Sequence, residues 1–353
     1  GGDEFTVILP DCDVEEAEFA AHRILNELSL HFNIFGRKLF VSTSIGAAFY
    51  PDDAQDAVGL VKAADTAMYR AKDSGKNRMQ MFRPEHRVHL LKEAAIENAL
   101  REAIHREALE LYFQPQFSAQ NPDQIVGAEA LLRWTDPTLG FVSPAEFIPV
   151  AEKSGLIADL GKFVELTAIK HILDWQSQGR RLPPIAINVS SQQFREKGFV
   201  QRLQALMLKH DLALDAIQVE ITESVLMNQE SGGAQTLQDM RQAGLDFSID
   251  DFGTGYSCLS YLKSLPVAEL KVDKSFVDGL GENTSDEEIA KAVLGMAKAL
   301  KLRTVAEGVE TQRQLEWLQK EGCDVIQGYL LGKPMPASDF SQLLLKHKVA
   351  TQA

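Results

Sequence analysis

The chain has few cysteines, a deficit of basic residues and no long apolar run, and each absence narrows its possible functions. Three cysteines, Cys12, Cys258 and Cys323, are too scattered for a CxxC metal site, and their odd number does not suggest a disulfide framework, so we expect a reducing cytoplasm. With 50 Asp and Glu against 36 Lys and Arg, the formal net charge is −14, which would repel long nucleic acid. No stretch approaches the roughly 18 consecutive apolar residues of a membrane span.

The composition is that of a folded protein of ordinary type. Hydrophobic residues make up 45% and charged residues 24% of 353 residues, and this length accommodates two domains, one of which has room for a barrel of about 250 residues. The chain starts at Gly1 without a methionine or a signal pattern. We therefore expect a piece of a longer protein, in which any membrane anchor would lie upstream.

The first 82 residues predict a small α/β unit that looks incomplete. The pattern is strand, helix, strand, helix and strand, over residues 5–9, 14–30, 39–50, 56–74 and 79–82. Residues 83–110 are rich in Ala, Leu and Glu at helical spacing and predict a connecting helix. We place a linker at 83–90, the second domain at 91–345 and a tail at 346–353.

The second domain repeats a short apolar run followed by a loop and a helical stretch. The runs are residues 111–113, 125–132, 185–189, 217–221, 247–249, 270–272, 304–305 and 325–326. Near-continuous apolar strands alternating with amphipathic helices indicate a parallel sheet that is buried on both faces. About eight such units favour a closed (β/α)₈ barrel over an open doubly wound sheet, for which a glycine-rich phosphate fingerprint is missing.

Polar residues recur at the carboxyl ends of these runs, and a barrel would gather them on one rim. They are Glu129, Asn188, Glu220, Asp250, Asp251, Lys271, Glu307 and Gln327. Several carboxylates on one rim repel each other unless cations neutralise them, and oxygen ligands without His or Cys suit Mg²⁺ or Mn²⁺. The sequence therefore predicts a magnesium-type site.

The pair Asp250-Asp251 is the sharpest local signal. Neighbouring side chains of a regular strand face opposite sides, so both serve one site only where the strand ends and turns, and Gly253 and Gly255 supply that turn. One aspartate then bridges two ions about 3.5–4 Å apart, the arrangement used in phosphodiester hydrolysis. Lys271 would hydrogen-bond the attacking water or stabilise charge on the phosphate, with Asp273 orienting its ammonium group.

Taken singly, each of these residues has an ordinary structural explanation. Asp250-Asp251 or Asn188 would cap a helix, and Lys271 would be a solvated surface lysine. The joint occurrence of several acids at strand ends favours the metal site, because the structural explanation must account for each one independently.

The residues in this order resemble the EAL domain family. The match begins at Glu129-Ala130-Leu131, extends over about 250 residues and includes the following segments: Ile187-Asn188-Val189-Ser190, Glu220-Ile221-Thr222-Glu223, Asp250-Asp251-Phe252-Gly253-Thr254-Gly255, Leu270-Lys271-Val272-Asp273, Glu307-Gly308-Val309-Glu310 and Gln327-Gly328-Tyr329. Three letters alone would mean little, but the ordered set is specific.

The resemblance implies a modified barrel with one antiparallel strand, which hydrolyses cyclic di-GMP (c-di-GMP) to linear pGpG with two Mg²⁺ or Mn²⁺ ions. It implies metal ligands at Glu129, Asn188, Glu220, Asp250, Asp251 and Glu307. Lys271 would act as the water-positioning or acid–base residue beside Asp273, and Glu307 joins them at the reaction centre. Glu223 would hold the loop after Asp250-Asp251, which the family ties to homodimerisation. Gln114, Arg133, Glu310 and Gln327 would touch substrate or support the site.

The first five residues, Gly1-Gly2-Asp3-Glu4-Phe5, resemble the motif of the GGDEF domain, the diguanylate cyclase fold. The earlier strand and helices of that family, with a metal-binding aspartate, are absent before Gly1, so we expect no cyclase activity. The leading function is thus c-di-GMP hydrolysis in bacterial signalling. The alternatives are a receptor that binds c-di-GMP without cleaving it, and part of a bifunctional GGDEF–EAL protein.

Overall fold

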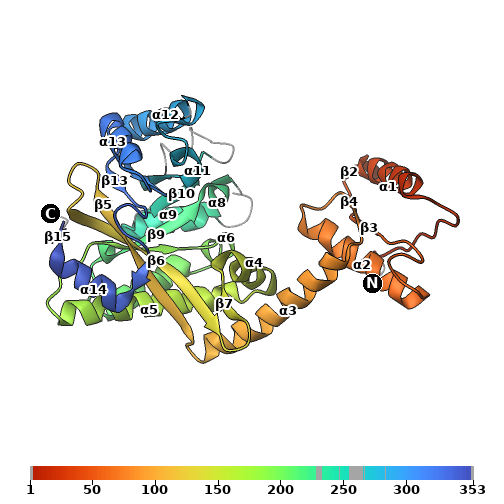
Figure 1. The fold of residues 1–353 in the computed structure, drawn as a ribbon, viewed down its shortest axis with the longest axis horizontal. Helices are drawn as coiled ribbons and strands as arrows, with labels where there is room; N and C mark the ends of the chain where they lie inside the picture. The colour runs from red at the N-terminus through yellow and green to blue at the C-terminus, as the bar shows by residue number, and fades with distance from the viewer. Residues whose placement is uncertain are drawn as a thin grey trace. The chain divides into compact units, whose positions relative to one another are not determined.

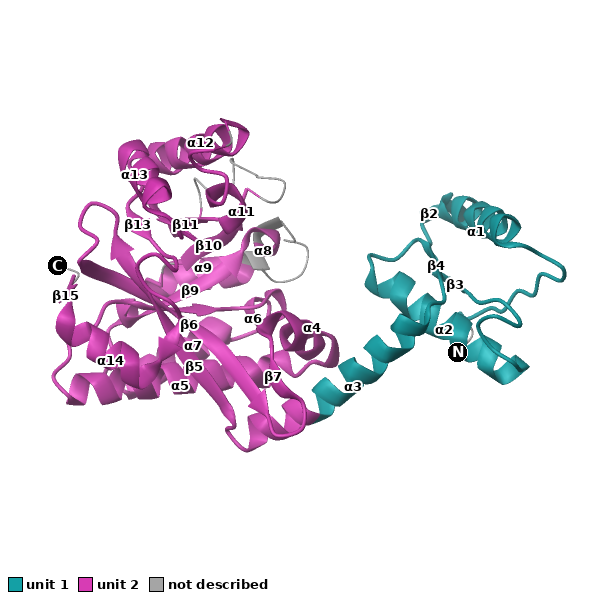
Figure 2. Ribbon diagram, viewed as in Figure 1, with its two compact units in different colours: residues 1–98 teal, residues 99–353 magenta. Residues whose placement is uncertain are grey.

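The computed structural model describes residues 3–227, 233–245, 247–253, 265, 267–282 and 284–350. The chain divides into two compact units, residues 1–98 and 99–353 (Figure 2). Helix α3 (Pro84–His105) continues without interruption from the first unit into the second, and it contains most of the linker expected at 83–90. No helix among the described residues is long and apolar enough to cross a bilayer.

The first unit pairs its strands two by two. Its elements are α1 (Val14–Ser29), β1 (Phe32–Ile34), β2 (Arg37–Leu39), β3 (Ile45–Ala47), α2 (Ala57–Asp73) and β4 (Met79–Met81). β1 and β2 form an antiparallel pair, whereas β3 and β4 form a parallel one. The Asp13 carboxylate accepts from Glu16 N at the start of α1, and Asp56 accepts from Gly59 N at the start of α2.

Two strand predictions in this unit were wrong in detail. Residues 5–9 form no strand, and Phe5 and Ile8 are 88% and 83% exposed. The strand expected over 39–50 is instead the end of β2 followed by the separate β3. A strand needs a hydrogen-bonded neighbour. Because β1 pairs with β2 and β3 with β4, residues 5–9 have no partner strand among the described residues.

The second unit is a closed eight-stranded barrel surrounded by helices (Figure 1). The barrel strands are β5 (Leu109–Ser118), β6 (Gln124–Asp136), β8 (Ile185–Asn188), β9 (Ile217–Thr222), β10 (Phe247–Phe252), β11 (Val267–Val272), β12 (Arg303–Ala306) and β13 (Val325–Ile326). β5 runs antiparallel to both β6 and β13, and this pairing closes the barrel. The predicted barrel and its one antiparallel strand are confirmed, and each expected apolar run coincides with a strand.

Short strands and helices complete this unit. The strands are β7 (Gly140–Val142), β14 (Met335–Pro336) and β15 (Lys348–Val349). The helices are α4 (Pro144–Ser154), α5 (Ile157–Ser177), α6 (Ser191–Phe194), α7 (Phe199–Lys209), η1 (Leu214–Ala216), α8 (Glu223–Met227), α9 (Gly233–Ala243), α11 (Lys274–Val277), α12 (Thr284–Leu300), α13 (Gln312–Glu321) and α14 (Ala337–Lys346).

The apolar core lies between the barrel wall and its helices. Alternate residues of a strand face opposite sides of a sheet. In β11, Leu270 and Val272 are fully buried in the apolar core. The alternate residues Glu269 and Lys271 are fully buried as well. Burying such a Leu or Val side chain contributes about 1.5–3 kcal/mol to stability. The intervening positions are then left for polar side chains inside the barrel.

Candidate metal and active site

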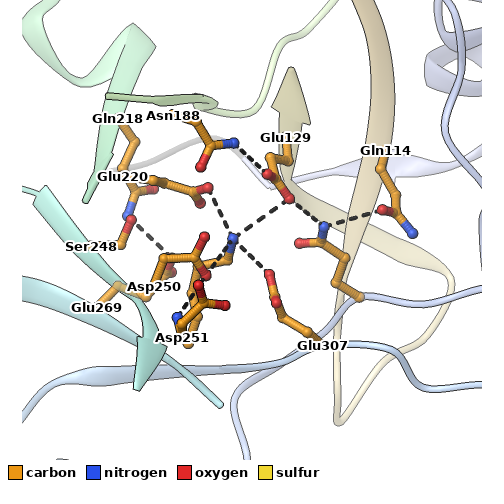
Figure 3. A network of polar contacts seen from close by, with 12 residues as sticks. Gln114, Glu129, Asn188, Gln218, Glu220, Ser248, Asp250, Asp251, Glu269 and Glu307 are labelled. Atoms are coloured by element: carbon orange, nitrogen blue, oxygen red, sulfur yellow. Dashed lines mark hydrogen bonds and ion pairs between the residues drawn. The ribbon is translucent and has the colours of Figure 1, made fainter. Parts of the chain in front are cut away.

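The centre of the site is the ammonium group of Lys271, whose side chain is completely buried. Its Nζ lies 2.6 Å from Glu307 Oε1, 2.9 Å from Glu220 Oε2, 3.2 Å from Asp250 Oδ1 and 3.5 Å from Glu129 Oε2. Figure 3 shows these acids pointing toward one centre from different strands and, for Glu307, from the segment that follows β12. The barrel therefore brings together residues that lie up to 178 positions apart in the sequence (307 − 129).

Parallel strands account for this convergence. Asn188 ends β8 and pairs in register with Glu220 on β9, while Glu307 directly follows β12 and Gln327 directly follows β13. Glu129 differs from the expectation, because it lies within β6 and not at its end. β6 continues to Asp136, pairing with β5 as far as Trp134 and with β7 from Trp134 to Asp136.

A bulge in β10 lets Asp250 and Asp251 serve one site. The register against β11 shifts between Ile249 and Phe252, and Asp251 adopts a left-handed φ of 54°. An extra residue in a strand redirects the side chains on either side of it. The sequence predicted that the strand would end here, whereas it continues to Phe252 and bulges. Gly253 has a φ of 99°, as expected for a turn, and Gly255 lies outside the described residues.

The side chains fit a divalent metal site. Oxygens of Asp250, Asp251 and Glu307 lie within 4.8 Å of one another. Glu220 Oε1 is buried and has no hydrogen-bond partner among the residues that the structure describes. Carboxylate and amide oxygens are the ligands of Mg²⁺ and Mn²⁺, and an orphaned buried oxygen is what a cation would satisfy.

One ammonium group does not neutralise this many acids. Burial, together with the charges of Glu129 and Asp250, raises the pKa of Glu220 well above its usual value. Burial also raises the pKa of Glu307 to about 8, and burial with the neighbouring Asp250 and Asp273 raises that of Asp251 to about 6. The carboxylates in turn overcome the effect of burial on Lys271 and raise its pKa well above 10.5, so it stays protonated.

Glu129 is the exception, because two amides hold its carboxylate. Asn188 Nδ2 donates to Oε1 over 2.6 Å, and Gln327 Nε2 donates to Oε2 over 2.6 Å. Burial alone would raise the pKa of Glu129, but Lys271 and these two amides outweigh it, so the pKa is lowered. Asn188 thereby keeps its own side-chain oxygen for another partner.

Comparison with known proteins places this site in a family, because residues 97–334 match the model described as "EAL domain". The chain belongs to the EAL domain family. Residues 1–78 match the model "Diguanylate cyclase, GGDEF domain".

Similar proteins carry both regions. The chain is 38% identical over 337 residues to the "Bifunctional diguanylate cyclase/cyclic di-GMP phosphodiesterase MucR" of Pseudomonas aeruginosa, covering 96% of this chain and 49% of MucR. It is 34% identical over 342 residues to the "Cyclic di-GMP phosphodiesterase PdeR" of Escherichia coli, covering 97% and 51%. The chain thus spans about half the length of these relatives.

Solved EAL structures share the fold. The "PaMucR Phosphodiesterase, c-di-GMP complex" is 40% identical with a TM-score of 0.66, and the alignment covers 70% of this chain and 99% of that one. The "EAL Enzyme Bd1971 - cAMP and cyclic-di-GMP bound form" is 30% identical with a TM-score of 0.69, covering 83% and 77%.

The other expected site residues of the EAL domain divide into two groups. Gln114 joins the cluster, since its Oε1 accepts from Gln327 Nε2 over 3.2 Å. The Oε2 of Glu223 accepts from Gly253 N over 3.2 Å, at the start of the loop that we expect Glu223 to hold. The rest of that loop, on which the prediction of a homodimer depends, lies outside the described residues.

Arg133, Glu310 and Asp273 make other contacts. The Arg133 guanidinium lies over the Tyr112 ring, 5.6 Å from its centroid, and Glu310 pairs with Lys274 at 2.6 Å. Asp273 was expected to orient Lys271, but its carboxylate caps α11 by accepting from Ser275 N over 3.0 Å.

Sequence reasoning missed Gln116, which is buried in the EAL barrel and donates to Gln327. One signal was available in the sequence. Gln116 lies two residues after Gln114 on the same strand, and therefore on the same strand face.

Proposed function

We propose that this domain hydrolyses c-di-GMP to linear 5′-pGpG with two Mg²⁺ or Mn²⁺ ions. The observation that carries this proposal is the convergence of four carboxylates on Lys271. Among the acids of the site, Asp250, Asp251 and Glu307 have oxygens that lie within 4.8 Å of one another. The solved EAL complex with c-di-GMP and the relatives named as c-di-GMP phosphodiesterases support this substrate.

The proposed metal ligands are oxygen atoms only. They are Glu129, Asn188, Glu220, Asp250, Asp251 and Glu307. Two bound cations would supply positive charge to the attacking water and to the phosphate oxygens. Each of these residues lies in a barrel strand, at its bulge or directly after its end, which supports the proposed ligand set.

The reaction balances as an ordinary hydrolysis. The water oxygen forms a new bond to phosphorus, the bond from phosphorus to the 3′ oxygen breaks, and that oxygen receives a proton. We propose Lys271 as the water-positioning or acid–base residue, because an ammonium group at this place would donate hydrogen bonds to the water or to the phosphate. Gln114 and Gln327 support the site beside Glu129, and we propose Arg133 and Glu310 as substrate contacts at its edge.

We further propose that the domain works as a homodimer in the cytoplasm and forms part of a longer signalling protein. Cys12 and Cys323 are free thiols, which fits a reducing compartment. The domain boundary is proposed within α3, with the phosphodiesterase domain at 91–345. Light scattering after size exclusion tests the dimer.

The deciding experiment incubates the purified chain with c-di-GMP and Mg²⁺ or Mn²⁺, with and without EDTA, and identifies products by mass spectrometry. We expect pGpG in the presence of metal and none with EDTA. Asp250→Asn should abolish turnover, since it removes a charge at the centre of the cluster. The matched control is Asp215→Asn, an exposed aspartate in η1 before β9. Intact c-di-GMP bound to the wild type would identify a receptor instead.

A further inference from the structure

Gln116 is connected to the carboxylate of Glu129 through one intervening side chain, that of Gln327. It belongs to β5 and is 2% exposed. Its Nε2 donates to Gln327 Oε1 over 2.8 Å, and Gln327 Nε2 donates to Glu129 Oε2 over 2.6 Å. The three side chains therefore form a buried chain of hydrogen bonds that ends on an oxygen of the acid cluster.

The direction of this chain is fixed by chemistry. An ionised carboxylate only accepts hydrogen bonds, so Gln327 must present its NH₂ group to Glu129. The Gln327 carbonyl oxygen then faces Gln116, which must donate. Gln114 agrees with this direction, because its Oε1 also accepts from Gln327 Nε2 and its Nε2 donates to Gly332 O over 3.1 Å.

The barrel interior makes room for Gln116. Its register partner across the antiparallel pair is Gly127 on β6. A Cβ atom at position 127 would lie 2.1 Å from Gln116 Oε1. The amide of Gln116 thus occupies space that any other residue at 127 would fill.

We propose that Gln116 is a positioning residue, which acts through Gln327 to hold Glu129 in the orientation that binds a divalent cation. This inference rests on the proposed function. Groups that hydrogen-bond a metal ligand from behind typically change metal affinity or activity by about 10- to 100-fold when removed. Gln116 is the donor that meets the Gln327 carbonyl oxygen, so it adds to the contacts that keep the Gln327 NH₂ group on Glu129.

Two substitutions of similar size separate this role from packing. Gln116→Met removes the donor, and Gln116→Glu replaces it with an acceptor that faces the Gln327 carbonyl. If the new carboxylate in Gln116→Glu is ionised, Gln327 must either keep two acceptors in contact or turn its own oxygen toward Glu129. Mn²⁺ affinity, measured by electron paramagnetic resonance without substrate, should fall about 10-fold in Gln116→Met and about 100-fold in Gln116→Glu.

The matched control is Gln319→Glu, which makes the same change on α13, where Gln319 Nε2 donates to Ala119 O over 2.6 Å. Its Mn²⁺ affinity should equal that of the wild type. Unfolding in EDTA reports the structural cost of each substitution, and Gln116→Met alone decides the question if Gln116→Glu does not fold. If the wild type binds Mn²⁺ and forms pGpG while both Gln116 variants bind Mn²⁺ equally well, the positioning role is wrong and the proposed function stands. A wild type that binds no Mn²⁺ overturns both.

Discussion

Lys271 Nζ lies 2.6 Å from Glu307 Oε1 inside the barrel, and the same nitrogen contacts three further carboxylates. A buried ammonium that faces four acids compensates part of their negative charge. Bound divalent cations would compensate the same carboxylates. Lys271 and the cations would therefore both stabilise the folded protein.

Lys271→Met should therefore destabilise the metal-free protein more than the metal-bound one. Removing one partner of a buried ion pair usually lowers the free energy of unfolding by about 3–5 kcal/mol. We expect this loss in EDTA, a smaller loss in saturating Mg²⁺, and no measurable hydrolysis in either case. Urea unfolding in both buffers provides the test. Lys291→Met, at the exposed pair with Glu321, is the control and should change stability by less than about 1 kcal/mol. An equal loss in both buffers would show that metal does not compensate the acids.

A second ion pair in the barrel joins the buried Glu269 to the partly exposed Arg303. Glu269 is fully buried, accepts from Arg303 Nε and from Gln218 Nε2, and burial raises its pKa. Arg303→Met should lower the free energy of unfolding by about 3 kcal/mol, because it leaves a buried carboxylate unpaired. The double variant Arg303→Met with Glu269→Leu should recover most of that loss. Calorimetry tests both, and a double variant no more stable than the single one would contradict the explanation.

The barrel was predictable because its strands are continuous apolar runs. Their polar ends also identified Glu220, Asp250, Lys271 and Glu307, since parallel strands must present their ends on one rim. The bulge at Asp251 was not predictable, because a register shift depends on the pairing of β10 with β11, which periodicity does not report.

The hydrogen-bond partners that the fold provides explain the remaining differences. The sequence alone does not tell whether the Asp273 carboxylate faces Lys271 or caps α11. The backbone conformation at the start of α11 determines that it caps the helix. Residues 5–9 have strand-like composition, but a strand also depends on a neighbour that composition does not specify.

Gly127→Ala should weaken Mn²⁺ binding without changing any acid. The added methyl group would lie 2.1 Å from Gln116 Oε1 and push that amide away from Gln327. We expect a loss of about 10-fold in Mn²⁺ affinity, as for other groups behind a metal ligand. Gly295→Ala in α12 is the control, because nothing lies within 4 Å of its added Cβ, and it should raise stability by up to about 1 kcal/mol. Unchanged Mn²⁺ affinity in Gly127→Ala would show that the barrel adjusts around the methyl group.

His171 predicts a pH dependence of stability that is separate from the metal site. Its ring stacks on Trp175 at 5.7 Å and meets Phe113 edge-on at 5.5 Å, and burial lowers its pKa below 6.5. The unfolded chain therefore takes up a proton at higher pH than the folded one. The contribution of the neutral ring is complete above about pH 6.5 and is lost as the pH falls toward the lower folded pKa. His171→Phe keeps a ring but cannot titrate, so the free energy of unfolding of the wild type should fall relative to the variant between about pH 7.5 and about pH 5.5. Urea unfolding of both proteins at these two pH values gives the difference between their free energies of unfolding. Acids that are common to both proteins contribute equally and cancel in this difference. A difference that stays constant with pH would show that His171 titrates equally in the folded and unfolded chains.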